Sequence, residues 1–206
     1  MDLWFEKCIN KQLYGEAYLV RFADDLLIMF QYERDAQRVY EAIIKRMELF
    51  GLELSKEKTR ILPFGRNCGT RETFDFLGFT HFNSKTRKGY YTVGHKISRK
   101  KKKQFKSNLK KWVKKNRNTQ FDKFMNALNK KLTGSFNYYS LSGMIREVRS
   151  LWIHTLYVTF KWMNRRSQRR SFKKERFCEI WNDQIVRPYI HVDIWSGNKV
   201  VYNKNV

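Results

Sequence analysis

Two adjacent carboxylates, Asp24 and Asp25, are the residues of this chain best suited to chemistry. They lie between two apolar, β-favouring runs, residues 18–20 and 26–30, which are too close together for a helical crossover. The sequence therefore predicts a β-hairpin whose tight turn presents both aspartates at its tip. Adjacent carboxylates repel each other, and Mg²⁺ is the usual compensation because it prefers oxygen ligands and retains open positions for phosphate. Two such ions, about 3.5–4 Å apart, could activate an attacking hydroxyl and stabilise a departing pyrophosphate.

The simplest alternative is a solvated turn, because aspartate is a common turn residue. The wider motif, Arg21-Phe22-Ala23-Asp24-Asp25, resembles the catalytic hairpin of reverse transcriptases, in which an aromatic residue and alanine precede two aspartates. It is most similar to the bacterial group II intron reverse transcriptase–maturase family, where tyrosine usually stands at the position of Phe22. The resemblance implies an RNA-directed DNA polymerase with a two-metal Mg²⁺ site at Asp24 and Asp25.

Elements that would position this hairpin follow it in the chain. Residues 33–50 carry apolar side chains at spacings of three or four and predict an amphipathic helix, which Gly51 would end. Residues 52–54 alternate as an edge strand should, and residues 57–62 also suggest a strand. In the family, this order of elements is the second half of a polymerase palm. Residues 1–95 are therefore predicted to be the C-terminal part of a reverse transcriptase palm.

Two further residues gain a role from the resemblance. Lys58 would lie near the incoming triphosphate and neutralise or protonate the leaving pyrophosphate; the alternative is a solvated lysine at a strand end. Residues 74–79 alternate aromatic side chains, which indicates a strand, and residues 76–79 resemble the primer-grip element. Gly78 would then let a nucleic-acid backbone approach closely, whereas the alternative is an ordinary core strand.

Charge is divided unequally along the chain. The net charge is +24, and residues 1–95 hold 15 Lys/Arg against 13 Asp/Glu, whereas residues 96–206 hold 28 against 6. Such a polycation requires a polyanionic partner or strong counterion binding. The three cysteines have no metal-site spacing, and no apolar run is long enough to span a membrane. We therefore expect an intracellular, cytoplasmic nucleic-acid-binding protein, with membrane-surface binding as the weaker alternative.

The basic residues gather on predicted helices. Ser98 is a plausible N-cap, and the basic run after it opposes the helix dipole, which suggests that the charge serves phosphate binding. A solvated lysine face is the alternative, although no acidic residue occurs between Lys96 and Phe121. RNA affinity should fall steeply with salt. The predicted nucleic-acid-binding residues, besides Gly78, are Arg99, Lys100, Lys101, Lys102, Lys103, Lys110, Lys114, Arg165, Arg166, Arg169 and Arg170.

The remaining pattern is helical. Residues 119–122 suggest a capping box for a second helix, which Gly134 would close, and a long helix is expected from about 141 to 163. Residues 132–139 resemble a segment of the maturase-specific thumb, with Phe136 where tryptophan is frequent. The resemblance implies that residues 96–206 form this all-α thumb, called domain X. The predicted fold class is therefore α+β, a partial antiparallel palm followed by a helical bundle.

One part of the expected active site has no candidate in the sequence. Two-metal catalysis needs ligands from more than one palm strand, and in the family another carboxylate and the fingers come from a segment expected before Met1. Nothing in their context supports Glu6 or Glu16 as substitutes. The expected partners are group II intron RNA, an RNA template with a DNA primer, dNTP, and an N-terminal fingers/palm polypeptide. The alternative is a non-catalytic RNA-binding splicing module that acts through the thumb-like half.

Overall fold

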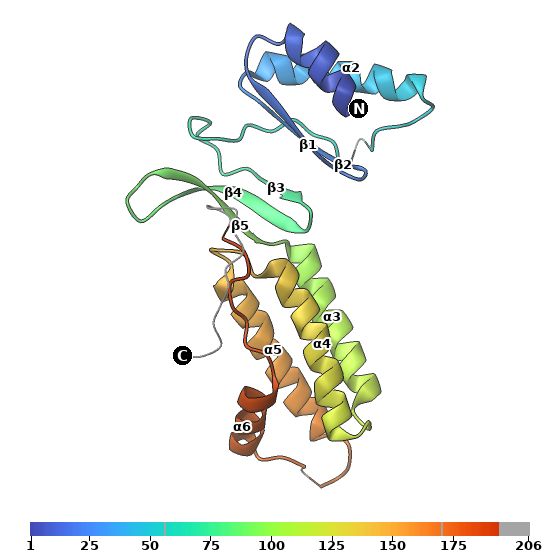
Figure 1. Ribbon diagram of the computed structural model, residues 1–206, viewed down its shortest axis with the longest axis vertical. Helices are drawn as coiled ribbons and strands as arrows, with labels where there is room; N and C mark the ends of the chain where they lie inside the picture. The colour runs from blue at the N-terminus through green and yellow to red at the C-terminus, as the bar shows by residue number, and fades with distance from the viewer. Residues whose placement is uncertain (56, 170, 194–206) are drawn as a thin grey trace. The chain divides into compact units, whose positions relative to one another are not determined.

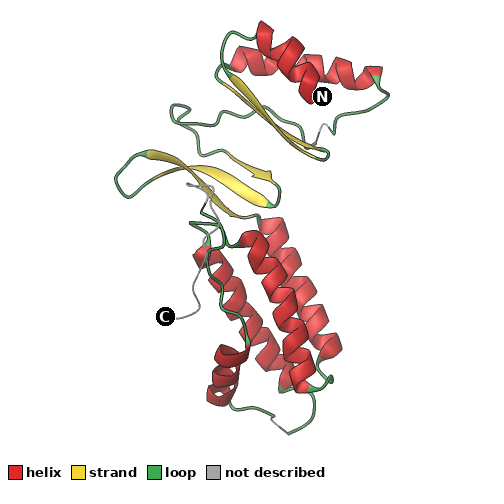
Figure 2. Cartoon of the chain, in the orientation of Figure 1, coloured by secondary structure: helices red, strands yellow, loops and turns green. Residues whose placement is uncertain are grey.

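The computed structural model of the protein describes residues 1–55, 57–169 and 171–193 (Figures 1 and 2). The fold is α+β, with helices and small antiparallel sheets, as expected. The chain forms two compact units, one of Met1–Leu77 with His81–Val93 and one of Gly78–Thr80 with Gly94–Val206. We call the first the N-terminal unit and the second the helical unit.

The N-terminal unit begins with a continuous but irregular helical segment. It consists of α1 (Asp2–Trp4), a π-helical turn (Phe5–Ile9) and a 3₁₀ turn (Asn10–Gln12). β1 (Ala17–Phe22) and β2 (Asp25–Phe30) follow as an antiparallel hairpin, and α2 (Glu33–Leu49) comes next. The predicted hairpin and amphipathic helix are therefore confirmed. Phe5, Ala17, Val39 and Ile43 form the buried core that joins the first helical segment, the hairpin and α2.

The two strands expected after α2 do not form. Residues 52–55 and 59–64 have no regular structure, and Lys58 lies in a turn. The backbone amides of Lys58 and Thr59 both donate to the carbonyl of Ser55, and the Thr59 hydroxyl does so as well. These groups are satisfied by a local turn, which leaves them unavailable for a strand ladder. Alternating side chains over so few residues do not form a strand when no partner strand is available.

A three-stranded sheet follows, in the order β3 (Thr73–Phe76), β4 (Phe79–Lys85) and β5 (Tyr91–Ile97). Leu77 and Gly78 connect the first two strands with φ angles of 50° and 81°. Positive φ at both central residues is characteristic of a type I′ hairpin turn. Residues 76–79 therefore span a turn, and the prediction of a single strand over residues 74–79 is wrong.

The helical unit contains α3 (Arg99–Asn116), α4 (Phe121–Tyr139), α5 (Ile145–Met163) and α6 (Lys174–Gln184). Ser98 caps α3 as predicted, because its hydroxyl accepts a hydrogen bond from the Lys101 amide at 3.4 Å. Apolar side chains from all four helices meet in one core. The buried members of that core are Leu109, Val113, Phe124, Met125, Leu128, Leu132, Phe136, Val148, Met163, Phe177, Trp181 and Ile185.

Three predicted helix boundaries are wrong. One is the start of α5, which begins at Ile145 and not at about residue 141. No side-chain cap forms at the start of α4, since its N-cap residue is Gln120 and the expected capping box begins one residue earlier. The helix also continues through Gly134 instead of ending there. Leu132 and Phe136 flank this glycine and are both buried, so continuing the helix places Phe136 in the core. The gain from burying a phenylalanine exceeds the cost of about 1 kcal/mol for an interior glycine.

The segment after α6 returns along the helices (Figure 1). The Val186 amide donates to Asn129, and the Trp152 indole donates to the Val186 carbonyl at 3.0 Å. Further on, the His191 amide donates to the Ser140 carbonyl at 2.7 Å. Through these bonds residues 185–193 fasten α4, α5 and α6 to one another. None of the helices in the described ranges is long and apolar enough to cross a membrane.

Two glycine substitutions should have opposite effects. Gly78→Ala should destabilise the protein by about 1–2 kcal/mol, because alanine disfavours the left-handed backbone found there. Gly134→Ala should stabilise it by about 0.5–1 kcal/mol, because this helical glycine has open space around it. Urea unfolding of both variants measures the two changes, and changes of the same sign would contradict this account of the turn.

Candidate catalytic hairpin and nucleic-acid interface

The turn between β1 and β2 presents the two aspartates as predicted. Phe22 pairs with Asp25, so Ala23 and Asp24 are the two central residues of the turn and Asp25 begins β2. Ala23 has a φ of 52°, and Asp24 has no positive φ. Positive φ at the first central residue alone is a feature of the type II′ turn, one of the two that match strand twist. Both aspartates are exposed at the tip of the hairpin.

The nearest cation in sequence does not neutralise this pair. Arg21 binds Asp2 instead, with Nη2 to Oδ2 at 2.7 Å and Nε to Oδ1 at 2.8 Å. This hydrogen bonding lowers the pKa of the Asp2 carboxyl and raises the pKa of the Arg21 guanidinium. Among the described residues, Asp24 and Asp25 have no ion-pair partner. Their combined negative charge is therefore available to a bound cation.

The two carboxylates fit Mg²⁺ only in part. Magnesium commonly binds through one or two carboxylates together with water and substrate phosphates, which Asp24 and Asp25 could satisfy for one ion. Within the described ranges, however, no three side chains of His, Cys, Asp or Glu come together as a metal site. When bound there, the ion would supply positive charge for phosphate chemistry. A two-ion site would need further ligands beyond these residues.

The hairpin has one covered and one open face. Directly opposite residues in an antiparallel pair share a face, so the register places Phe22 with Asp25, Val20 with Leu27 and Tyr18 with Met29. On the other face Leu19, Ile28 and Phe30 pack on the core with α2. The open-face side chains are substantially exposed: Tyr18 60%, Val20 42%, Phe22 62% and Met29 47%. Val20 is exposed because its face of the hairpin lies opposite the core.

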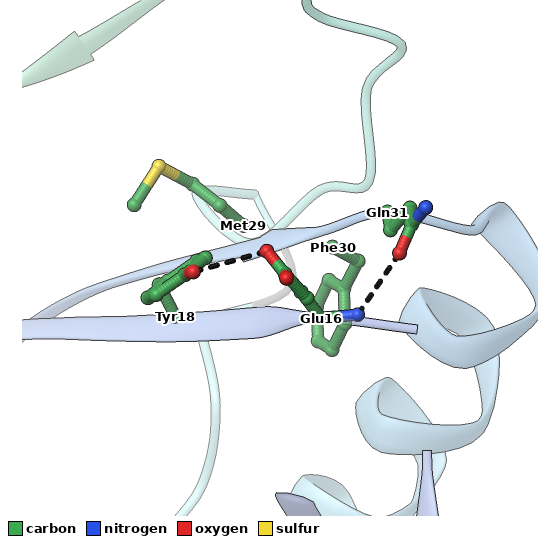
Figure 3. Close-up of a pocket in the computed structure, with 5 residues that line it drawn as sticks. All are labelled: Glu16, Tyr18, Met29, Phe30 and Gln31. Atoms are coloured by element: carbon green, nitrogen blue, oxygen red, sulfur yellow. Dashed lines mark hydrogen bonds between the residues drawn. The ribbon is translucent and has the colours of Figure 1, made fainter. Parts of the chain in front are cut away.

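A shallow hollow of about 380 Å³ lies at the other end of the hairpin (Figure 3). Glu16, Tyr18, Met29, Phe30 and Gln31 line it. The Tyr18 hydroxyl donates to Glu16 at 3.0 Å, and this bond raises the pKa of the Tyr18 phenol. Tyr18 lies four strand positions before Phe22, the last residue of β1, which corresponds to about 13 Å between the hollow and the turn. The hollow is therefore not a substrate pocket of the aspartate pair.

The other two expected site residues lie in turns, where the sequence predicted strands. Lys58 is exposed in its turn, and no described hydrogen bond or ion pair links it to Asp24 or Asp25. A side chain added at Gly78 would lie 3.4 Å from Lys101 Cγ and 3.7 Å from the Tyr139 hydroxyl. The glycine is thus explained by its positive φ in a hairpin turn. Close approach of nucleic acid to Gly78 stays a prediction.

Most of the predicted nucleic-acid-binding cations are exposed. Lys102 is an exception, because its Nζ lies 2.6 Å from Glu147 Oε2 in an ion pair between α3 and α5. Arg166 is half-buried, its Nη2 contacts the Met163 sulfur, and burial lowers the pKa of its guanidinium. Arg170 lies outside the described residues. The exposed members of the set are Arg99, Lys100, Lys101, Lys103, Lys110, Lys114, Arg165 and Arg169.

A family model, reverse transcriptase (RNA-dependent DNA polymerase), matches residues 1–81. The match includes the aspartate hairpin, α2, Lys58 and Gly78, and it supports a reverse transcriptase-type polymerase. At the level of that family the activity is RNA-directed DNA polymerisation with divalent metal ions, an RNA template and a nucleic-acid primer. The chain matches no curated protein.

Proposed function

We propose that this chain carries the catalytic hairpin and the RNA-binding thumb of a bacterial group II intron-encoded reverse transcriptase–maturase. In this proposal residues 1–95 belong to the palm and residues 96–206 to domain X. The observation that carries it is the exposed, uncompensated Asp24–Asp25 pair at a hairpin tip, within the segment matched by the reverse transcriptase family. Such a pair has a physical reason to hold Mg²⁺ beside phosphate.

Each part of the chain then has a distinct task. Asp24 and Asp25 hold Mg²⁺, which supplies charge for nucleotidyl transfer from dNTP, and Lys58 contributes positive charge toward the departing pyrophosphate. The exposed ring of Phe22, which pairs with Asp25, offers apolar surface to a sugar or base beside the metal. The basic helical unit holds intron RNA and the primer–template through phosphate contacts.

The proposal includes a partner polypeptide. The described residues bring no third metal ligand to Asp24 and Asp25. Two-ion phosphoryl transfer needs ligands that clamp both ions, so a fingers/palm polypeptide would have to supply another carboxylate. Activity should therefore require reconstitution of the chain with such a segment.

Primer extension tests this function directly. The chain, alone or combined with a separately expressed fingers/palm segment, is given an RNA template, a labelled DNA primer, dNTP and Mg²⁺. Extension should appear only in the combination, and Asp24→Ala should reduce it at least about a hundredfold, since a metal ligand contributes several kcal/mol. Glu41→Ala is the control, because this exposed acid lies on α2 away from the turn. Extension that survives Asp24→Ala would refute the assigned site.

A second function, RNA binding without catalysis in support of splicing, is favoured by the unequal charge. The 28 Lys/Arg against 6 Asp/Glu after residue 95 suffice for RNA binding without the aspartate pair. In that case filter binding of structured RNA should be tight, salt-sensitive and unchanged by Asp24→Asn. Loss of affinity in Asp24→Asn with Mg²⁺ present would favour the polymerase reading.

A further inference from the structure

One indole ring of the helical unit is surrounded by cations. The Trp162 ring centroid lies 5.6 Å from Lys114 Nζ, 5.4 Å from Arg117 Cζ and 5.6 Å from Arg165 Cζ. Lys114 lies in the last turn of α3 and Arg117 is its C-cap, while Trp162 and Arg165 lie at the end of α5. Figure 1 shows the last turns of α3 and α5 at the same end of the helical unit. We call these four residues the Trp162 cluster.

The charge of this cluster is not neutralised by nearby acids. None of the ion pairs in the described part of the chain involves Lys114, Arg117 or Arg165. The two helix C-termini provide some compensation, since each carries roughly −0.5 elementary charge. Three cations against about one negative charge leave an excess of about two. Cation–π attraction to tryptophan holds such groups near a ring but does not remove their charge.

The other aromatic rings in the described part of the chain have fewer cations near them. The Trp112 ring has Lys131 at 5.7 Å, and the Tyr14 ring has Arg34 at 3.4 Å and Arg38 at 5.8 Å. Dipole stabilisation of a helix end would account for one cation at each C-terminus. The third cation, and the convergence of all three on a single ring, therefore require a different explanation.

We propose that the Trp162 cluster is a binding site for the phosphodiester backbone of an RNA strand. The excess of about two charges matches two phosphodiester groups, each of which carries one negative charge. Arg117 and Arg165 can donate paired N–H groups to phosphate oxygens, and no described carboxylate competes for them. This inference rests on the proposed RNA binding by the helical unit and assigns it a particular site. Trp162 and Arg117 were not among the residues predicted from sequence, because only the packing of α3 against α5 brings them together.

The test is a salt titration of RNA binding by the full chain, with labelled oligouridylate as the probe because it does not form base pairs. The site variant combines Lys114→Gln, Arg117→Gln and Arg165→Gln. Each phosphate contact of a single strand contributes about 0.7 to the slope of log Kd against log salt, so loss of two contacts should lower the slope by about 1.4. From the same slope, affinity at about 0.1 M salt should fall about 25-fold.

The matched control removes the same charge from the same two helices. It combines Lys111→Gln, Lys115→Gln and Arg149→Gln, which are exposed and outside the cluster. The control should change the slope by less than about 0.7, one phosphate contact. Arg165→Glu is a second variant, which places a carboxylate in the cluster at an exposed position. It should cause most of the loss in RNA affinity, and unchanged circular dichroism would show that the variant still folds.

The outcomes separate this inference from the proposed function. Equal losses in the site and control variants would show general electrostatic attraction and overturn the site, while RNA binding itself would stand. A wild-type chain that binds no RNA would overturn both. Trp162→Leu should also weaken binding and Trp162→Phe should retain most of it, because a second aromatic ring still holds the cations. Unchanged RNA affinity in Trp162→Leu would show that the indole ring is not part of the site.

Discussion

Trp181→Ala should lower the free energy of unfolding of the helical unit by about 3–5 kcal/mol. Trp181 is fully buried on α6, and its ring lies 5.7 Å from Trp152 and 6.2 Å from Phe177. Removing the indole leaves a cavity between α5 and α6, and the loss of both transfer energy and ring contacts accounts for the size of the effect. Urea unfolding followed by far-UV circular dichroism measures it, because the helical unit dominates that signal.

Two further variants test whether loss of the buried ring causes this destabilisation. Trp181→Phe should cost clearly less than alanine, because it retains a ring and because the indole N–H has no hydrogen-bond partner in the described structure. Tyr157→Ala on α5 is the control: this residue is 56% exposed, and its replacement should change stability by no more than about 0.5 kcal/mol. Equal unfolding midpoints for Trp181→Ala and Tyr157→Ala would contradict the proposed role of α6 in this core.

Asp35→Ala should destabilise the N-terminal unit by about 2–4 kcal/mol, since two backbone amides would each lose a part-buried hydrogen bond to the carboxylate. The carboxylate is 1% exposed and accepts bonds from the amides of Tyr14 at 3.0 Å and Gly15 at 3.1 Å. These two residues form the bend through which the chain enters β1. The small core beneath, with Phe5 and Val39 among its buried members, has little reserve to offset the loss.

Amide hydrogen exchange is the appropriate measurement for Asp35→Ala. Protection of the β1–β2 amides, residues 17–30, should fall sharply, because the hairpin is anchored by this bend. Asp35→Asn retains an acceptor oxygen and should lose less protection than alanine. Glu33→Ala is the control in the same helical turn, since Glu33 is exposed and should leave protection unchanged. Protection that is equal in Asp35→Ala and Glu33→Ala would show that the bend does not depend on the buried carboxylate.

The elements that the sequence predicted correctly are those with a strong local period. The hairpin, α2 and the helices of the helical unit have apolar side chains on one face, and this pattern fixes element type whenever a core is available. The errors fall where a local pattern competes with a longer-range interaction. Residues 57–62 find a local turn at Ser55 instead of a partner strand, and Gly134 stays helical because Phe136 reaches the core.

The candidate sites also contain some features that the sequence predicts and others that depend on the tertiary structure. Sequence spacing alone determined that Asp24 and Asp25 stand at a hairpin tip, because the five residues between the two β-favouring runs are too few for a helical crossover. Only the tertiary structure decided that Arg21 is bound by Asp2, 19 residues away in the chain, which leaves the aspartates without a cation. It also decided that the ends of α3 and α5 gather three cations at Trp162. Periodicity determines which face of an element is buried, whereas the partner of an exposed charge depends on which elements pack together.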